Sequence, residues 1–225
     1  VLTEKQIKYG FDYYHKDDAR PKSVVEVSEY DGEDKLIINC TQLDEGYSAK
    51  DKKRIWLEWC DFLVNNPDTF TELMFCTRMP QELFDAVCAQ RRLKKLHIKW
   101  GVYPDISKLE SLQELEYLHI GSGRSVSSLE PISRLVNLVA LSIENFQQID
   151  DYAPLANLKH LESLALEGDF AAPKILKVQS LEFLRHMKQL RFFSLLTAKV
   201  IDKDYSPVLE LNNLEHLTLK SCKEV

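Results

Sequence analysis

The sequence predicts an α/β solenoid, a right-handed coil of repeating units with a parallel sheet on the concave side and short helices or 3-10 turns on the convex side. Two observations carry this prediction: a leucine pattern that recurs about every 23 residues, and a short apolar stretch, often opened by proline, that precedes it. The chain has 225 residues, 44% hydrophobic and 28% charged, a balance typical of a globular protein with a real core.

The first observation is a repeat of the form L-x-x-L-x-L. It occurs at Leu93-Leu96-Ile98, Leu115-Leu118-Ile120, Leu138-Leu141-Ile143, Leu161-Leu164-Leu166, Leu190-Phe193-Leu195 and Leu214-Leu217-Leu219, and a seventh copy is Phe70-Leu73-Phe75. The middle positions are spaced by 23, 22, 23, 23, 29 and 24 residues. Alternation within L-x-L is the period of a strand, so the leucines point inward and the residues between them point outward.

The second observation is a pair of apolar residues before each of several strands. The pairs are Ile106-Leu109, Ile132-Leu135, Leu155-Leu158 and Val208-Leu211, and Pro131, Pro154 and Pro207 stand immediately before three of them. Proline favours the first turn of a helix because its missing N–H would have no partner there. Each unit therefore reads as strand, loop and short helical turn, and stacked units cover the apolar faces that one unit leaves open.

These motifs resemble the leucine-rich repeat family over residues 69–225, about seven units, in the short 22–23-residue class of internalins and phosphatase regulators. The resemblance implies the solenoid fold and a role in binding other proteins. The family places Asn or Cys three residues after the last strand leucine, whereas this chain has Gly101, Gly123, Phe146, Asp169, Ala198 and Cys222 there. The polar ladder is mostly missing, so the array is degenerate.

Residues 1–68 are expected to form an N-terminal cap for the first repeat. Asp31-Gly32 separates two β-rich runs and predicts a hairpin, and Ser48 begins a helix that carries Trp56 and Trp59 as core-covering residues. At the other end no polar cap is visible after Leu219. We therefore expect self-association through the uncapped C-terminal end, or continuation of the array in a longer protein.

Charge and cysteine content narrow the classes of partner. The net charge is −6, of which residues 1–68 carry −5 (10 basic against 15 acidic residues), and this excludes nucleic acid as a default partner. No apolar run is long enough for a membrane span. The five cysteines are widely spaced without a C-x-x-C pair, which favours free thiols and a cytoplasmic location.

The outward strand residues should form the functional surface. In such a sheet, equivalent residues of neighbouring strands lie about 4.8 Å apart and touch. The predicted partner-binding residues combine charged, imidazole and aromatic side chains: Lys95, His97, Lys99, Trp100, Tyr117, His119, Glu144, Glu167 and Phe192. If the histidines are central, binding should vary between pH 5 and 8.

An enzyme is the competing class, since His97, His119 and Ser142 fall side by side with Glu144 nearby. A nucleophile also needs an oxyanion hole, and the N–H groups of a strand are committed to the sheet. Two histidines are too few for a zinc site, which takes three or four protein ligands. We therefore predict no catalytic residues, no metal and no cofactor.

The sequence thus favours a non-enzymatic protein–protein interaction module that binds another protein through its concave sheet. One alternative is a stoichiometric inhibitor of the immunity type that blocks a toxic enzyme, since complementary charge speeds association. Another is a fragment of a larger leucine-rich repeat receptor or adhesin. A toxin gene next door would favour the first alternative, and further repeats upstream or downstream would favour the second.

Overall fold

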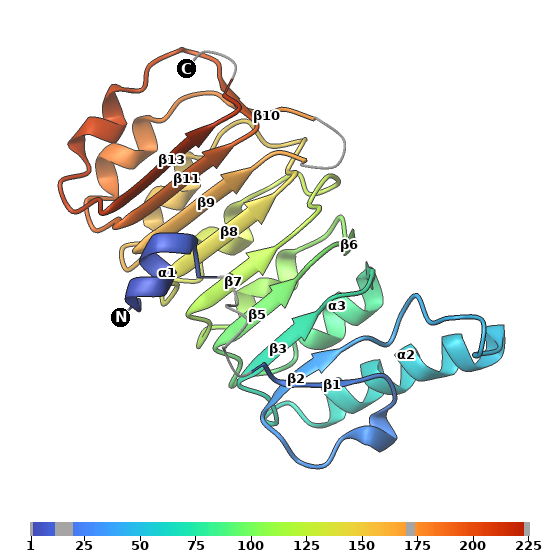
Figure 1. Cartoon of the computed structure of the whole chain (residues 1–225). Helices are drawn as coiled ribbons and strands as arrows, with labels where there is room; N and C mark the ends of the chain where they lie inside the picture. The colour runs from blue at the N-terminus through green and yellow to red at the C-terminus, as the bar shows by residue number, and fades with distance from the viewer. Residues whose placement is uncertain (1, 12–19, 170–173, 223–225) are drawn as a thin grey trace.

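The computed structural model describes residues 2–11, 20–169 and 174–222. Nine strands form one sheet in the order β1-β2-β3-β5-β7-β8-β9-β11-β13, and each neighbouring pair is parallel (Figure 1). Short helical turns run along the other side of the sheet. The predicted α/β solenoid is therefore confirmed.

The sheet strands are β1 (Lys22–Val24), β2 (Lys35–Ile38), β3 (Glu72–Phe75), β5 (Lys95–Ile98), β7 (Tyr117–Ile120), β8 (Ala140–Glu144), β9 (Ser163–Glu167), β11 (Phe192–Leu196) and β13 (His216–Lys220). Seven of them coincide with the seven repeat copies. Leu73, Leu96 and Leu118 are paired across consecutive strands, and the same row continues to Leu217. The leucine spacing therefore predicted the register correctly.

The convex side carries η2 (Ser107–Ser111), α4 (Glu130–Ser133), η3 (Ala153–Asn157), η4 (Glu182–His186) and η5 (Ser206–Glu210). Proline occupies the first or second position of α4, η3 and η5, as predicted. The apolar residues of these turns face the inward strand leucines, and one core cluster runs from Val24 to Cys222. Stacking thus buries what a single unit would expose.

Tight turns follow the strands and take the place of a polar ladder. Ser122, Asn145 and Thr197 adopt positive φ values of 59°, 60° and 50°, each two residues after the last inward strand residue. Gly123 leaves room for the ring of Phe146 from the next unit, and the Gly123 N–H donates to the Glu144 carbonyl at 2.9 Å. Aromatic packing and turn-to-turn backbone bonds therefore replace the family's usual side chains. Beyond the turns, β4 (Met79–Pro80) pairs with β6 (Gly101–Val102), and β10 (Leu176–Val178) pairs with β12 (Ala198–Val200).

The predicted hairpin at Asp31-Gly32 is wrong, because β1 and β2 are parallel, with Lys22 opposite Leu36. A type I′ hairpin turn needs positive φ at both central residues. Only Gly32 has it, with φ of 107°. The 3-10 turn η1 (Val27–Glu29) instead redirects the chain over the sheet, where Glu26 and Glu29 cap each other's backbone.

Helix α2 (Ala49–Asn65) begins after Ser48, whose hydroxyl accepts from the Asp51 N–H at 3.1 Å, as the sequence predicted. Trp59 is fully buried, and its indole N–H donates to the Val25 carbonyl at 2.8 Å, while Trp56 is half-buried. Helix α3 (Gln81–Val87) follows Pro80. Because β2 pairs with β3, the sheet is continuous across the expected boundary at residue 68, and that boundary stays a prediction.

Candidate functional site

The outward residues of the sheet form three columns on the concave face. The amino-terminal column is Glu72, Lys95, Tyr117, Ala140, Ser163, Phe192 and His216, and the middle column is Met74, His97, His119, Ser142, Ala165, Ser194 and Thr218. A carboxyl-terminal column contains Glu144, Glu167, Leu196 and Lys220. The register thus brings most of the predicted binding residues onto one surface.

Side chains in the front half of the face pair along the columns. Lys95 Nζ lies 3.1 Å from Glu72 Oε1, and both side chains are less than one-fifth exposed. The imidazoles of His97 and His119 stack with centroids 4.2 Å apart. His119 Nδ1 lies 3.0 Å from Ser142 Oγ. The front of the face is therefore an ordered polar surface.

The predicted variation of binding between pH 5 and 8 stays a prediction, but His97 is not the group that would cause it. Burial, followed by the neighbouring His119, Lys95 and Lys99, lowers the pKa of His97 to about 2. Its Nδ1 atom is covered and has no hydrogen-bond partner among the described residues. A ring in this environment stays neutral from pH 5 to 8, because charging it would desolvate a cation beside other cations.

An N-terminal strap, residues Leu2–Phe11, lies across the concave face, and the sequence reasoning missed it (Figure 1). It contains helix α1 (Glu4–Tyr9). The Thr3 hydroxyl accepts from the Gln6 N–H at 3.2 Å, and Gln6 Oε1 accepts from the Thr3 N–H at 2.9 Å. Gly10 ends the helix with φ of 90°. A capping box before a C-terminal glycine was the signal in the sequence that identifies this helix.

The strap packs on the amino-terminal column. Leu2, Ile7 and Phe11 are 3–5% exposed and form a cluster with the fully buried Ala140. The rings of Phe11 and Tyr117 lie 6.0 Å apart. This cluster is separate from the main core, so the strap is bound to the face of the solenoid rather than built into its interior.

The strap changes the exposure of the predicted binding residues. Tyr117 is half-buried beside it, while His119 and Phe192 are 8% and 5% exposed. Phe192 stacks on His216, with centroids 4.9 Å apart. The remaining predicted residues divide into exposed Lys99 and half-buried Lys95, His97, Trp100, Glu144 and Glu167.

The run of basic residues from 91 to 99 does not form a single positive patch. Arg91 pairs with Asp68, and Lys94 Nζ lies 3.1 Å from Glu116 Oε1. These carboxylates belong to neighbouring units, as does the Glu72 partner of Lys95. The positive charges of these sequence neighbours are therefore paired with carboxylates that the fold brings beside them.

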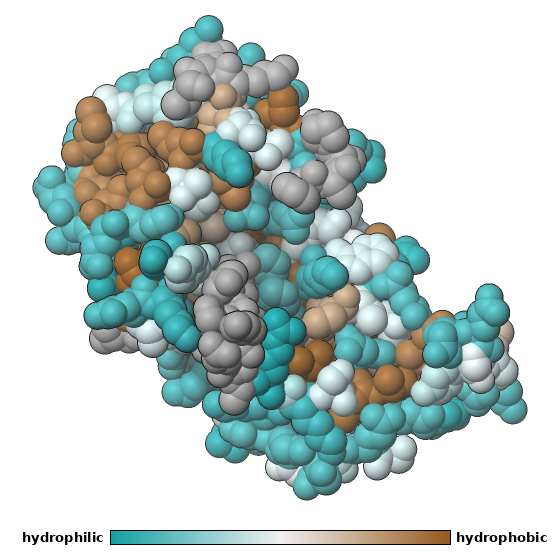
Figure 2. Space-filling view, viewed as in Figure 1, coloured by the Kyte–Doolittle hydropathy of each residue, from teal (hydrophilic) through white to brown (hydrophobic). Residues whose placement is uncertain are grey.

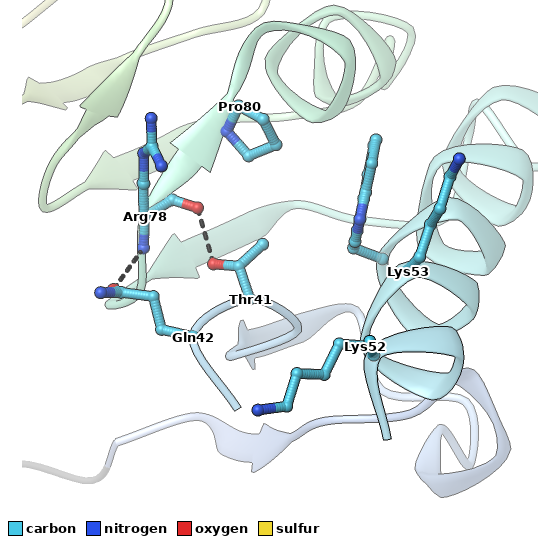
Figure 3. Close-up of a pocket in the computed structure, with 8 residues that line it drawn as sticks. Thr41, Gln42, Lys52, Lys53, Arg78 and Pro80 are labelled. Carbon is cyan, nitrogen blue, oxygen red and sulfur yellow. Dashed lines mark hydrogen bonds between the residues drawn. The ribbon is translucent and has the colours of Figure 1, made fainter. Parts of the chain in front are cut away.

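Several hollows are large enough to receive side chains of another molecule, and two of them adjoin the strap and helix α2. One, of about 260 Å³, lies between Tyr9 and Phe11 of the strap and Phe192 and His216 of the sheet. The other is a cleft of about 600 Å³ away from the concave face, between α2 and the turns after β2 and β3 (Figure 3). Its lining combines an apolar floor with cations: Thr41, Gln42, Ala49, Lys52, Lys53, Trp56, Arg78 and Pro80.

One wall of that cleft consists of two turns that are joined by hydrogen bonds. The Thr41 hydroxyl donates to the Arg78 carbonyl at 2.6 Å, and the Arg78 N–H donates to Gln42 Oε1 at 2.9 Å (Figure 3). Three cations line it, with no carboxylate among the described lining residues. Lys52, Lys53 and Arg78, with Trp56 beside them, therefore form a cationic surface that is separate from the concave face.

His119 and Ser142 are the neighbouring side chains that the sequence analysis considered for catalysis. His119 and Ser142 are in hydrogen-bond contact, but Ser142 is 1% exposed and its strand is paired on both sides. Within residues 2–11, 20–169 and 174–222, no three His, Cys, Asp or Glu side chains cluster as metal ligands would. No helix in this part of the chain has the length and apolarity needed to cross a membrane.

Comparison with known proteins gives structural likeness only. No protein-family model matches the chain, and no curated protein matches its sequence. Among solved structures, internalin C2 of Listeria monocytogenes is similar with 21% identity and a TM-score of 0.50, over 82% of this chain and 67% of that one. A leucine-rich repeat protein of Leptospira interrogans is 17% identical, with a TM-score of 0.42, over 85% of this chain and 55% of that one.

The likeness to internalin C2 extends over most of the sheet and turns described above. At this level of identity it bears on the fold alone. The in-register leucines, the three proline-opened turns and the parallel sheet are consistent with that fold. The chain therefore folds as a degenerate leucine-rich repeat solenoid.

Proposed function

We propose that this protein is a non-enzymatic protein-binding module whose partner contacts the concave face. The observation that carries the proposal is the set of registered columns, which place charged, imidazole and aromatic side chains on one ordered surface. Aromatic residues anchor protein interfaces, and charged residues around them favour a partner of complementary charge. The solenoid fold is a scaffold suited to such extended concave surfaces.

The proposed contact residues are Lys95, His97, Lys99, Trp100, Tyr117, His119, Glu144, Glu167 and Phe192. Those with exposed or half-buried side chains can contact a partner directly. His119 and Phe192 lie at 8% and 5% exposure, so they support the surface from beneath while the strap is in place. Glu144 and Glu167 are opposite each other on β8 and β9, so both carboxylates belong to the same part of the face.

The test is affinity capture from native lysate with mass spectrometry, comparing variants of the full chain. Changing His97, Tyr117 and His119 to Ala, or Glu144 and Glu167 to Lys, should remove the same partner. The matched control is Lys53→Glu with Arg78→Glu, which alters charge in the cleft away from the face. A partner retained by both face variants would contradict the proposal.

We propose no hydrolytic role for His119 and Ser142. The Ser142 hydroxyl is covered, and the neighbouring backbone groups of β8 are paired with β7 and β9. A Ser142→Ala variant that captures the partner as the parent does would agree with a binding role. Loss of an activity in that variant alone would contradict it.

A reducing, cytoplasmic setting is proposed from the cysteines. All five lie in the described residues as free thiols, and burial raises the pKa of Cys40 and Cys60 to about 12. Such thiols are poor nucleophiles and behave as small apolar side chains. Thiol counting on protein from its native host under denaturing, non-reducing conditions should give five.

Self-association through the C-terminal end is proposed from exposed leucines. The edge strand β13 exposes Leu217 by 45%, and Leu209 in η5 is 84% exposed. Figure 2 shows an apolar area over this end of the molecule. Sedimentation should detect a dimer that Leu217→Lys weakens, since a charge on an edge strand opposes pairing; a monomer at all concentrations would contradict it.

A further inference from the structure

The N-terminal strap packs where the outward residues of the amino-terminal column are small. Ala140 and Ser163 are the two small residues of the amino-terminal column, and the larger Tyr117 and Phe192 flank them. Both small residues are at most 1% exposed. This arrangement makes a depression two strands wide, where Leu2, Ile7 and Phe11 of the strap cluster with Ala140 and pack beside Tyr117.

The strap fills that depression through side chains on one face. Ile7 comes from α1, and Leu2 and Phe11 come from its two ends. Leu2 precedes the N-cap Thr3 and Ile7 follows four positions into the helix, the spacing of a hydrophobic staple. The strap therefore presents a compact apolar set, held by local caps, to a matching surface.

A helix this short has no stability of its own. Nucleating a helical turn is unfavourable, and isolated helices under roughly 12 residues are marginal in water even when well capped. Helix α1 has six residues, so its order depends on the face that it covers. The two surfaces are thus complementary, and neither belongs to the main core.

We propose that this depression is a receptor site for a short amphipathic helix, and that a helix of a partner protein binds there after the strap is displaced. The inference rests on the proposed function and names its partner chemistry: a capped helix with apolar residues on one face. The apolar floor and the flanking Tyr117 supply affinity, as in other helix-in-groove complexes.

A strap that packs on this depression also regulates access to it in this proposal. A tethered segment competes at an effective concentration on the order of millimolar. A partner helix must therefore bind more tightly than the strap, or bind when the strap is weakened. The strap excludes weak ligands from a face whose centre would otherwise expose apolar side chains.

The test uses the full chain and a synthetic peptide of residues 2–11 as the probe. Ile7→Asp in the full chain should release the strap, because it places a charge in an apolar hollow. The peptide should then bind this variant at least about tenfold more tightly than it binds the parent chain, the scale expected for losing one buried isoleucine. Amide shifts in β7, β8 and β9 report the binding by NMR.

Two matched controls keep the result specific. The same peptide carrying Ile7→Asp should not bind either chain. Adding Ala140→Leu to the Ile7→Asp chain should abolish binding by filling the depression, and Tyr117→Ala should weaken it if the Ala140 variant does not fold. Urea unfolding of each chain shows that the solenoid is intact, since the strap lies outside the main core.

Equal affinity of the peptide for the parent and Ile7→Asp chains would overturn the inference. So would the absence of any binding to the Ile7→Asp chain at peptide concentrations several times the millimolar effective concentration of the tethered strap. If the parent chain forms dimers in which each copy binds the strap of the other, the occupant of the site is a second copy of this chain. That result would overturn the partner proposed here. These outcomes leave the capture experiment with Glu144 and Glu167 untouched. The proposed function and this inference therefore fail separately.

Discussion

His97 and His119 stack face to face at the front of the concave sheet, with 4.2 Å between ring centroids and 14° between ring planes. They belong to neighbouring strands and occupy the same register position. Stacking covers His97 and leaves its Nδ1 atom without a described hydrogen-bond partner. Protonation of His97 therefore affects both the charge of the concave face and the free energy of unfolding.

Removing His97 should flatten the acid dependence of stability. Its folded pKa is about 2 and its ordinary value is 6.5, so between these pH values only the unfolded chain takes up the proton. The free energy of unfolding must then fall as pH falls below 6.5, by up to about 1.4 kcal/mol per pH unit. His97→Phe should lose about 2 kcal/mol less than the parent between pH 7 and 4.5.

Urea unfolding at both pH values measures this difference. Carboxylates that titrate in the same range contribute to both proteins, so comparing the two slopes isolates the histidine. Identical slopes would show that His97 takes up its proton in the folded state. In that case the face would gain charge in mild acid.

Truncating an inward leucine should destabilise the solenoid far more than truncating an exposed one. Leu141 is fully buried in β8, whereas Leu209 is 84% exposed in η5. Leu141→Ala should cost about 2–5 kcal/mol through lost burial and the cavity left behind. Leu209→Ala should stay within about 0.5 kcal/mol. Similar losses in urea unfolding would contradict the inward assignment of the repeat.

Gln90 should be essential to the junction between α2 and the repeats. Its side chain is fully buried, accepts from the Phe70 N–H at 3.2 Å, and donates to the Leu63 and Asn66 carbonyls at 2.6 and 2.9 Å. Gln90→Leu removes the partner of the Phe70 N–H and of the Leu63 carbonyl, at about 1–3 kcal/mol each, whereas the Asn66 carbonyl keeps its bond from the Thr69 hydroxyl. We expect a total loss of about 2–6 kcal/mol in urea unfolding.

The matched control for Gln90 is Gln113, an exposed residue whose side chain donates to the Glu110 carbonyl at 2.6 Å. Water replaces that bond when it is lost, so Gln113→Leu should change stability by less than about 0.5 kcal/mol. Comparable effects at both sites would mean that burial of Gln90 does not matter.

Gly123 and Phe146 should show strong coupling. A Cβ at Gly123 would overlap the Phe146 ring, so Gly123→Ala should cost about 1–3 kcal/mol by overpacking. Phe146→Leu removes the overlapping atoms. In the double variant the losses should therefore fall short of their sum by about 0.5–3 kcal/mol, measured by a double-mutant cycle. Additive losses in the free energy of unfolding would show that the two residues do not interact.

The repeat, the register and the turns could be predicted from residues close together in the sequence. Leu96 and Ile98 alternate with His97, and alternation places them on opposite faces of a strand whatever surrounds them. Proline before an apolar pair sets the first turn of η3 and η5 in the same local way. The L-x-L motif aligned the columns, because each unit adds one strand at the same register even where the spacing is 29 residues.

Tertiary structure alone decided what lies on the face. Ile7 and Ala140 are more than 130 residues apart, and no local pattern announces that one covers the other. The parallel pairing of β1 with β2 likewise depends on where η1 directs the chain, which overrides the turn preference of Asp31-Gly32. Local periodicity sets which side of a strand a residue faces; contacts between distant segments set whether that side meets water, an ion partner or the chain's own N-terminus.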